Sequence, residues 1–253
     1  MNIVATAKRL GADLAGVASI EAIGQGGVHI DEGLLPGARS VIAIGVGQRR
    51  AALLSADIAM AQHDTLNAYD GVSRVGHALS KHLADAGHEA LTVPAFVPLD
   101  MRDGRQGMVG AVDLRGVAVL AGLGWYGQSA LLVTARYGPR VRLAAVVTTA
   151  DIEATPAATS PACPGGCRTC LDACPAGALP GGGRVDKTAC GRVVFKYGLR
   201  GLLRFARELS TANPAEREEL LRGRAMRELW QTFVSGIYYS CFRCQAVCPV
   251  GGP

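Results

Sequence analysis

The chain has 253 residues, a formal net charge of +5 and a hydrophobic fraction of 49%. This length accommodates one substantial domain and a smaller one, and the apolar content is ample for a core. Gly, Arg, Asp or Thr interrupts every apolar run before it reaches the roughly 18 residues of a membrane span. The amino terminus lacks the pattern of a signal peptide. We therefore expect a soluble, cytoplasmic protein that does not bind membranes.

The first part of the sequence predicts helices interspersed with strands. The expected helices cover 2–10 and 57–86, the expected strands cover 14–18, 40–46, 90–93, 117–121 and 141–149, and a turn lies at 34–37. Both helices end at a glycine, Gly11 and Gly87, which is a common helix stop. The uninterrupted apolar run at 40–46 is typical of a buried strand. We expect an α+β domain over residues 1–156.

All eight cysteines follow residue 162, and they form two runs. The first run contains Cys163, Cys167, Cys170 and Cys174, and the second contains Cys190, Cys241, Cys244 and Cys248. Each run ends in C-x2-C-x3-C-P, the pattern by which bacterial ferredoxins hold 4Fe-4S clusters. Thiolates are also the ligands that soft iron prefers. The spacing predicts two 4Fe-4S clusters in a domain over residues 157–253.

Two other uses of eight thiols remain open at this point. Disulfides need an oxidising compartment, and the amino terminus lacks the pattern of a signal peptide that would direct the chain to one. Two four-cysteine zinc sites would also consume all eight thiols. Zinc sites do not, however, require a fourth Cys three residues on followed by Pro, and that feature occurs twice here. The pattern favours iron–sulfur clusters over both alternatives.

In two-cluster ferredoxins the last Cys of each run ligates the other cluster. Applied to this chain, one cluster takes Cys163, Cys167, Cys170 and Cys248, and the other takes Cys174, Cys190, Cys241 and Cys244. The first gap is C-x3-C rather than C-x2-C. Its two glycines, Gly165 and Gly166, tolerate a wider loop. Cys163 is therefore the ligand that departs most from the pattern.

The cysteine-rich half contains further features. A linker rich in Pro, Thr and Ala covers 157–164. Asn213 and Pro214 predict the start of a helix that runs to about residue 230. Basic residues gather between Arg192 and Arg227. They form either a solvated helix face or a docking surface for an acidic electron donor or for phosphate groups.

The segment 121–133 reads AGLGWYGQSALLV, and its glycines have three interpretations. Gly122, Gly124 and Gly127 match G-x-G-x-x-G, but a dinucleotide site needs a long helix next, and Gly138 and Pro139 cut the following segment short. The glycines also suit close approach to a large flat ligand, on which an aromatic side chain would stack. The third interpretation is a tight turn.

Taken together, several motifs resemble the epoxyqueuosine reductase family and, more distantly, the reductive dehalogenases. They are the segment 121–133, the YGPRVR run at 137–142, the two cysteine runs and the LPGARSVI run at 35–42. The resemblance covers nearly the whole chain. It implies a corrinoid-binding, nitroreductase-like domain with a mixed sheet, followed by a ferredoxin-like double-cluster domain.

The resemblance also implies roles for individual residues. A corrinoid, cobalamin, would lie against Gly122, Gly124, Trp125, Tyr126, Gly127 and Gln128. Asp113 is the candidate proton donor, although an aspartate in a surface turn is the favoured interpretation of this residue. An electron donor such as a flavodoxin or a ferredoxin would reduce the clusters, which in turn reduce the cobalt.

Two departures from the family bear on the substrate. Members that act on transfer RNA resemble one another in a Val-Asp-Ser/Thr-x-Pro segment, whereas here Val112 and Asp113 lead into a run without Pro. The sequence also stops soon after Cys248. We therefore expect a reductase that acts on a small molecule rather than on transfer RNA. The alternatives are a non-catalytic electron carrier and a zinc-stapled module that binds nucleic acid. The five scattered histidines are expected not to be ligands.

Overall fold

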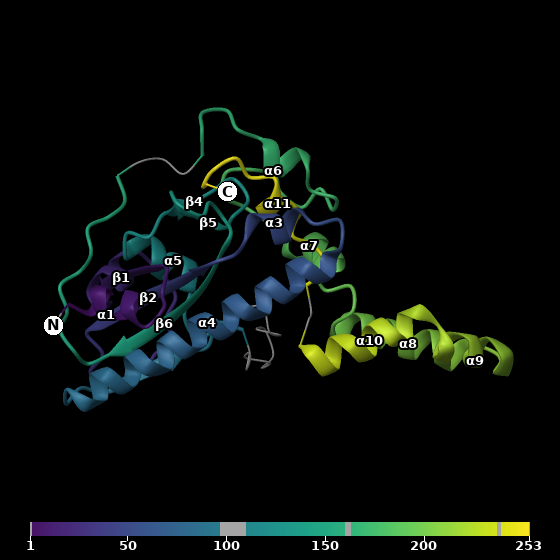
Figure 1. The fold of residues 1–253 in the computed structure, drawn as a ribbon, viewed down its shortest axis with the longest axis horizontal. Coiled ribbons are helices and arrows are strands. Elements are labelled where there is room, and N and C mark those ends of the chain that lie inside the picture. Colours follow the sequence, from purple (N-terminus) through teal and green to yellow (C-terminus); the bar gives the residue numbers. More distant parts are fainter. Residues whose placement is uncertain (1, 97–109, 160–162, 237–238, 253) are drawn as a thin grey trace.

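The computed structural model describes residues 2–96, 110–159, 163–236 and 239–252. Its centre is a four-stranded sheet in the order β1-β2-β6-β3 (Figure 1). The strands are β1 (Leu14–Ser19), β2 (Ser40–Gly47), β6 (Val141–Thr148) and β3 (Ala90–Val93). Each of the three pairings is antiparallel, and Ile42 lies opposite Val146. The expected mixed sheet is therefore wrong for the described strands.

Helices cover both faces of this sheet, so that it lies between two apolar layers. The long helix α4 (Ile58–Asp85) and α1 (Ile3–Arg9) cover one face, while α5 (Leu114–Leu120) and α2 (Ile20–Gln25) cover the other. Successive strand residues point to opposite faces. Ile42 and Ile44 accordingly join the cluster under α4, and Val41 joins the cluster under α5.

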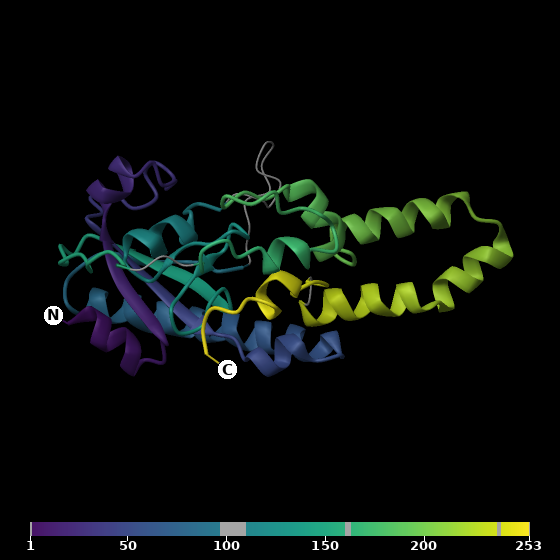
Figure 2. The same cartoon turned by 90° about the horizontal axis from the view of Figure 1, so that it is seen from above.

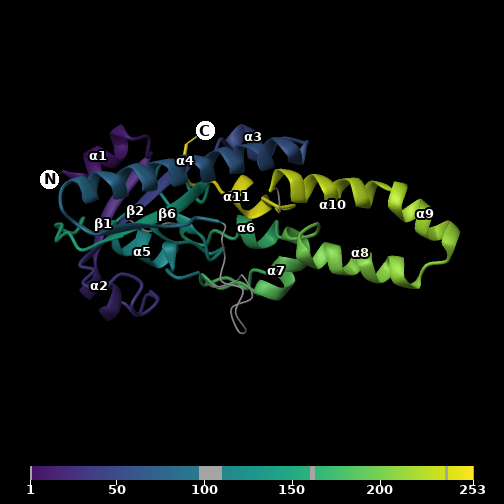
Figure 3. The same cartoon turned by 90° about the horizontal axis from the view of Figure 1, so that it is seen from below.

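The cysteine-rich half wraps around one end of this sandwich and sends out a helical hairpin. Its short helices are α6 (Thr169–Asp172), α7 (Lys187–Val194) and α11 (Arg243–Ala246). The hairpin comprises α8 (Leu199–Thr211), α9 (Pro214–Arg222) and α10 (Arg224–Ser235). Figures 2 and 3 show it projecting away from the body, with α8 and α10 side by side. Helix α3 (Arg50–Leu54) contacts α4 and α11.

Most of the expected elements are present. Helix α1 begins after Asn2, whose side chain accepts a hydrogen bond from Ala5 N, and α4 is capped in the same way by Asp57. Strands β1, β2, β3 and β6 match the predicted ranges within one or two residues. Among the described helices, none is both long and apolar enough to cross a membrane.

Two predicted elements are wrong. The segment 117–121 was expected to be a strand but belongs largely to helix α5, which is capped by Asp113. The single helix expected over 213–230 is two helices that break at Gly223, where ψ is 167°. The start at Asn213 is confirmed, with a capping box to Glu216. Helices α2, α3 and α8 and the short hairpin of β4 (Trp125–Tyr126) and β5 (Leu132–Val133) were not predicted.

Candidate cluster sites and the adjoining cavity

The eight cysteines lie in the part of the chain around α6, α7 and α11, at the end of the four-stranded sheet nearest the separate β4–β5 hairpin (Figure 1). Three of them lie on short helices: Cys170 on α6, Cys190 on α7 and Cys244 on α11. The others lie in the adjoining loops. Cys170 and Cys248 are buried and the remaining six are half-buried. None forms a disulfide.

Four of the thiols influence one another electrostatically and form a first set. Burial raises the pKa of Cys170, and the thiolates of Cys248, Cys163 and Cys167 raise it further. Burial likewise raises the pKa of Cys248, with additional contributions from Cys163 and Cys167. Each of these neighbours is a member predicted from the ferredoxin pattern. Cys163 lies with this set despite its wider loop.

The other four thiols form a second set by the same criterion. Burial raises the pKa of Cys190, and Cys241 and Cys174 raise it further. Burial also raises the pKa of Cys244 to about 12, followed by the thiolates of Cys241 and Cys190. Cys170 of the first set also contributes to this shift. The two sets therefore lie next to each other.

These pKa shifts indicate which kind of group the two sets of thiols would bind. Several thiolates held together in a poorly solvated place repel one another, so the thiols stay protonated unless a cationic group balances their charge. Among the described residues, no three His, Cys, Asp or Glu side chains converge closely enough to hold one metal ion. A four-iron cluster keeps its thiolates farther apart than a single ion does, so this spacing does not count against a cluster.

Arg140 ties the carboxy-terminal cysteine run to the sheet. Its side chain is 1% exposed. Its guanidinium donates to the carbonyl oxygens of Cys248, Val250 and Gly252 at 3.4, 3.3 and 2.9 Å. Gln245 on α11 adds a hydrogen bond to Pro139 O at 3.3 Å. The loop before β6 thus fixes the position of the last cluster ligand.

In the glycine segment, the absence of side chains lets the chain pack against itself. Gly122 has φ +74°, and a β-carbon there would overlap Pro156 O. A β-carbon at Gly124 would overlap Val133 O, and one at Gly127 would meet the Val133 side chain. The segment forms the β4–β5 hairpin, with Trp125 opposite Val133. These contacts agree with the tight-turn interpretation, and the corrinoid contact of this segment stays a prediction.

The side chains of Gln128 and Tyr126 form hydrogen bonds with different parts of the chain. Gln128 Oε1 accepts a hydrogen bond from Gly182 N at 2.7 Å, which joins the turn to the loop before α7. The Tyr126 hydroxyl donates to Asp113 Oδ2 at 3.2 Å. Burial and the Asp113 carboxylate raise the pKa of Tyr126. The candidate proton donor therefore has a hydroxyl partner that keeps its proton at neutral pH.

Asp113 has a structural role as well. Its Oδ1 accepts a hydrogen bond from Arg115 N at 3.1 Å, which caps α5. The Arg115 guanidinium donates to Ala130 O at 2.8 Å and so braces a residue with a φ of 61°, unusual for alanine. The Asp113 side chain is 32% exposed.

A cavity of about 590 Å³ lies between the sheet and the cysteine-rich half. This volume is within the range of small-molecule and cofactor sites. Its lining includes Val93, Asp113, Leu132, Arg142, Lys187 and Tyr239. Asp113 therefore faces this cavity, whereas the residues at 122–128 are not among those that line it. The walls combine aliphatic side chains with the cations of Arg115, Arg142 and Lys187.

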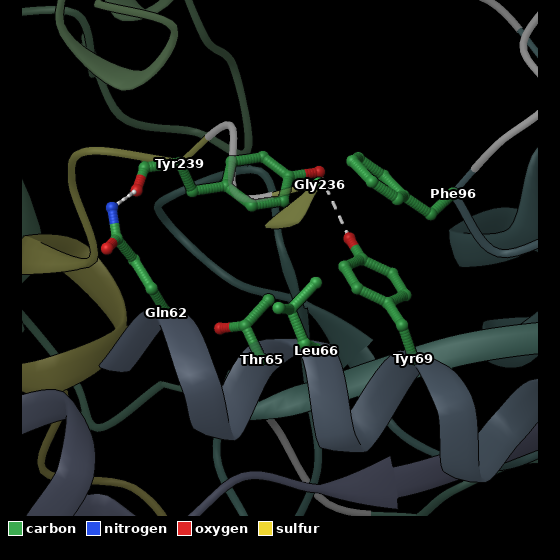
Figure 4. Close-up of a pocket in the computed structure, with 7 residues that line it drawn as sticks. All are labelled: Gln62, Thr65, Leu66, Tyr69, Phe96, Gly236 and Tyr239. Atoms are coloured by element: carbon green, nitrogen blue, oxygen red, sulfur yellow. Dashed lines mark hydrogen bonds between the residues drawn. The ribbon is translucent and has the colours of Figure 1, made fainter. Parts of the chain in front are cut away.

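Aromatic residues separate this cavity from the second set of thiols. Tyr239 stands two residues before Cys241, and its hydroxyl is 3.0 Å from that of Tyr69. Figure 4 shows Tyr239 facing α4 and joined by hydrogen bonds to Gln62 and Tyr69. The Arg142 guanidinium lies over both rings, 5.3 Å from Tyr69 and 5.6 Å from Tyr239.

Sequence reasoning missed Arg140, Arg142 and Tyr239. The signal for the two arginines was present, since both interrupt or adjoin an otherwise apolar strand. A charged residue in such a run is rarely buried without a partner. Within the described residues, the Arg142 Nε atom is buried and makes no hydrogen bond.

The chain is similar in sequence to known proteins, although no family model matches it. It is 27% identical to the epoxyqueuosine reductase of Bacillus cereus over 230 residues, which cover 85% of this chain and 49% of the relative. It thus spans about half the length of that curated relative.

Two solved structures share the fold. One is an epoxyqueuosine reductase with an epoxyqueuosine-modified tRNA-Tyr stem loop, with a TM-score of 0.55 and 22% identity over 98% of this chain and 64% of that chain. The other is a reductive dehalogenase described as suggesting a mechanism for B12-dependent dehalogenation, with a TM-score of 0.60 and 17% identity over 90% of this chain and 36% of that chain. The expected resemblance is confirmed: the chain is similar in sequence to epoxyqueuosine reductases and shares its fold with them and with reductive dehalogenases.

Proposed function

We propose that this protein is an iron–sulfur reductase whose two 4Fe-4S clusters deliver electrons to a bound corrinoid, for the reduction of a small-molecule substrate. The grouping of the thiols into two adjacent sets of four is the observation that carries this proposal. The donor chemistry fits, because thiolates that repel one another favour a cationic iron–sulfur centre over an empty site. The names of the similar proteins support a reductase.

Each set would hold one cluster. Cys163, Cys167, Cys170 and Cys248 form the first site, and Cys174, Cys190, Cys241 and Cys244 form the second. Adjacent clusters give electrons a short path through the protein, and Tyr239 fills the space between the second set and the cavity. The ring centroid of Tyr239 lies 6.4 Å from that of Tyr69 and 6.3 Å from that of Phe242.

The cavity suits a small-molecule substrate in size and in its mixed lining. A corrinoid supplies low-valent cobalt, a strong nucleophile that protein-bound iron–sulfur clusters of low potential are able to reduce. Asp113 lies in the wall and would hold a proton for the substrate, while the Tyr126 hydroxyl, which keeps its own proton, would donate a hydrogen bond to the Asp113 carboxylate left after that proton is transferred. Arg115 keeps the Asp113 carboxylate oriented.

The corrinoid part of the proposal is tested by producing the protein with cobalamin supplied and recording its visible spectrum. We expect corrin absorption bands that stay with the protein through gel filtration. Apoprotein mixed with free cobalamin and separated in the same way is the control for adventitious binding. A protein that retains iron but no corrinoid would refute corrinoid binding and would favour the alternative of a non-catalytic electron carrier. The ligand-sized cavity supports an enzyme over such a carrier.

The role of Asp113 is tested by Asp113→Asn. Asparagine also caps helices, so the free energy of unfolding should change by less than about 0.5 kcal/mol. Loss of the proton donor should lower kcat by about 10²-fold or more, a typical contribution of general acid catalysis. Asp151→Asn, at an exposed ion pair with Arg39, is the matched control. A kcat equal to that of the wild type would leave Asp113 with the helix cap as its only role.

A further inference from the structure

Cys190 of the second set of thiols lies in a segment that has many basic residues and no acidic ones. Between residues 187 and 207 the chain has six basic residues and no Asp or Glu. These are Lys187, Arg192, Lys196, Arg200, Arg204 and Arg207, and all of them are exposed. Two acids approach them: Glu208, four residues further along α8, lies 3.8 Å from Arg204, and Glu228 on α10 interacts with Lys196. The segment therefore remains strongly cationic.

Large apolar side chains are exposed beside this charge. On α8, Leu199 and Leu203 are 56% and 63% exposed. Trp230 and Val234 on α10 are 62% and 67% exposed. A solvated helix face would not hold so many large apolar groups in water, and such gatherings mark sites of interaction. Apolar residues bordered by charge are the composition of a protein–protein interface.

The helical pattern places the two kinds of side chain next to each other. Arg200, Arg204 and Arg207 recur at spacings of four and three and share one face of α8. Leu199 and Leu203 lie on the helix face next to these arginines. On the side of α8 toward α10, Phe205 is buried, and the absence of a side chain at Gly201 allows Leu229 of α10 to approach. The exposed stripe is therefore the side of α8 that α10 leaves free.

The base of the hairpin adjoins the second set of thiols. Helix α7 contains Cys190 and leads into α8, and the chain returns from α10 directly to Cys241. Ser240 N donates to Val194 O at 2.8 Å, which pins the outgoing and returning segments together. The rings of Phe195 and Tyr239 lie 5.7 Å apart at the same place. A protein bound at this base would lie beside Cys190 and Cys241.

We propose that the base of the hairpin, formed by α7, the first half of α8 and the end of α10, is the docking surface for a small acidic electron-carrier protein. The inference rests on the proposed function in that the second set of thiols holds a cluster. In each encounter the reduced carrier is oxidised by one electron and the cluster is reduced by one electron, with no bond formed or broken. The cationic segment provides charge complementarity, and the leucine stripe favours a protein over a nucleic acid, which would use the cations alone.

The test compares two triple variants with the wild type. Lys196→Glu, Arg200→Glu and Arg204→Glu reverse charge on the proposed surface. Lys8→Glu, Arg39→Glu and Lys81→Glu produce the same change in net charge on α1, before β2 and near the end of α4. These positions lie at the opposite end of the molecule from the hairpin (Figure 1). All six are exposed, so both variants should keep their far-ultraviolet circular dichroism.

Two measurements use flavodoxin as the probe. Anaerobic stopped flow follows cluster reduction by photoreduced flavodoxin, and calorimetry follows binding of oxidised flavodoxin. For the surface variant at low ionic strength we expect a rate at least about 10-fold lower and correspondingly weaker binding, because electrostatic steering accelerates association by about 10–10³-fold. The control variant should stay within about twofold of the wild type. Dithionite, which needs no docking surface, should reduce all three proteins equally fast.

The outcomes separate this proposal from the proposed function. Equal flavodoxin rates and equal binding in the two variants would overturn the docking surface. The docking surface is also overturned if the surface variant loses binding to a transfer-RNA stem loop, or loses self-association in sedimentation, while its flavodoxin rate is unchanged. Charge-dependent flavodoxin binding to a protein that contains no iron would support the surface and refute the clusters.

Discussion

The sheet domain and the cysteine-rich half are stabilised in different ways. The strands of the sheet bury Ile42, Ile44 and Val146 completely between two helical layers. In the cysteine-rich half, α6 and α11 have four residues each, and α9 buries none. Two of the thiols are among its few buried groups. Apolar burial therefore stabilises one half of the molecule, whereas the other half would depend for its stability on the proposed clusters.

The largest effect should come from removing a ligand of the second set. Cys244→Ser deletes a half-buried ligand of one cluster, so we expect iron to fall from about eight to about four atoms per chain. The segments around α7 and α11 should become sensitive to protease, because binding of a structural metal centre supplies folding free energy. Ser210→Ala, at an exposed position of α8, is the control. Full iron content in Cys244→Ser would contradict the assignment.

Truncation of a core side chain in the sheet should lower the free energy of unfolding without changing the iron content. Ile44→Ala removes a fully buried side chain beneath α4 and should lower the free energy of unfolding by about 2–5 kcal/mol. The iron content should stay unchanged, since the thiols lie outside this core. Leu54→Ala, at a residue 52% exposed, should cost less than about 1 kcal/mol. Loss of iron in Ile44→Ala would show that the two halves fold as one unit.

A smaller effect is expected at the contact between the halves. Arg140→Met keeps most of the side-chain volume but leaves three carbonyl oxygens without their donor. We expect a loss of about 1–3 kcal/mol in the free energy of unfolding and faster hydrogen exchange near Cys248. Arg136→Met, at an exposed residue whose guanidinium lies over Tyr137, provides the comparison. Equal effects of the two substitutions would argue against the role of Arg140.

The affinity of the cysteine-rich half for iron should depend on pH. Burial and neighbouring thiolates raise the pKa of Cys244 to about 12, and the pKa values of Cys170, Cys190 and Cys248 rise in the same direction. These thiols are protonated at neutral pH in the metal-free chain, so cluster assembly releases protons. Iron affinity during reconstitution with sulfide should increase at least about tenfold per pH unit between about pH 6.5 and 8.5, equivalent to about 1.4 kcal/mol. Competition with a chelator measures it, and an affinity independent of pH would contradict the account.

Sequence predicted the elements that carry strong local signals. Asp57 and Gly87 bracket α4. The assignment of the eight cysteines to two clusters stays a prediction. The short apolar run at 117–121 suggests a strand because periodicity cannot separate a short strand from a buried helix. The cap at Asp113 was the overlooked signal. Strand direction is also not encoded locally, so the mixed sheet inferred from the family resemblance was wrong.

Other features depend on tertiary contacts that no local pattern shows. Helix α8 begins at Leu199, after Gly198, which has no side chain to cap it, and several of its apolar residues are exposed. Arg140 and Tyr239 acquire their roles only when the end of the chain folds back against the sheet. The cavity likewise joins residues far apart in sequence, from Val93 to Gln245.

Anaerobic purification followed by iron and acid-labile sulfide analysis tests the central claim most directly, with electron paramagnetic resonance after dithionite reduction. We predict a brown protein with about eight iron and eight sulfide atoms per chain and the signals of two interacting reduced 4Fe-4S clusters. Colourless protein without iron, or protein with stoichiometric zinc and no sulfide, would contradict the account.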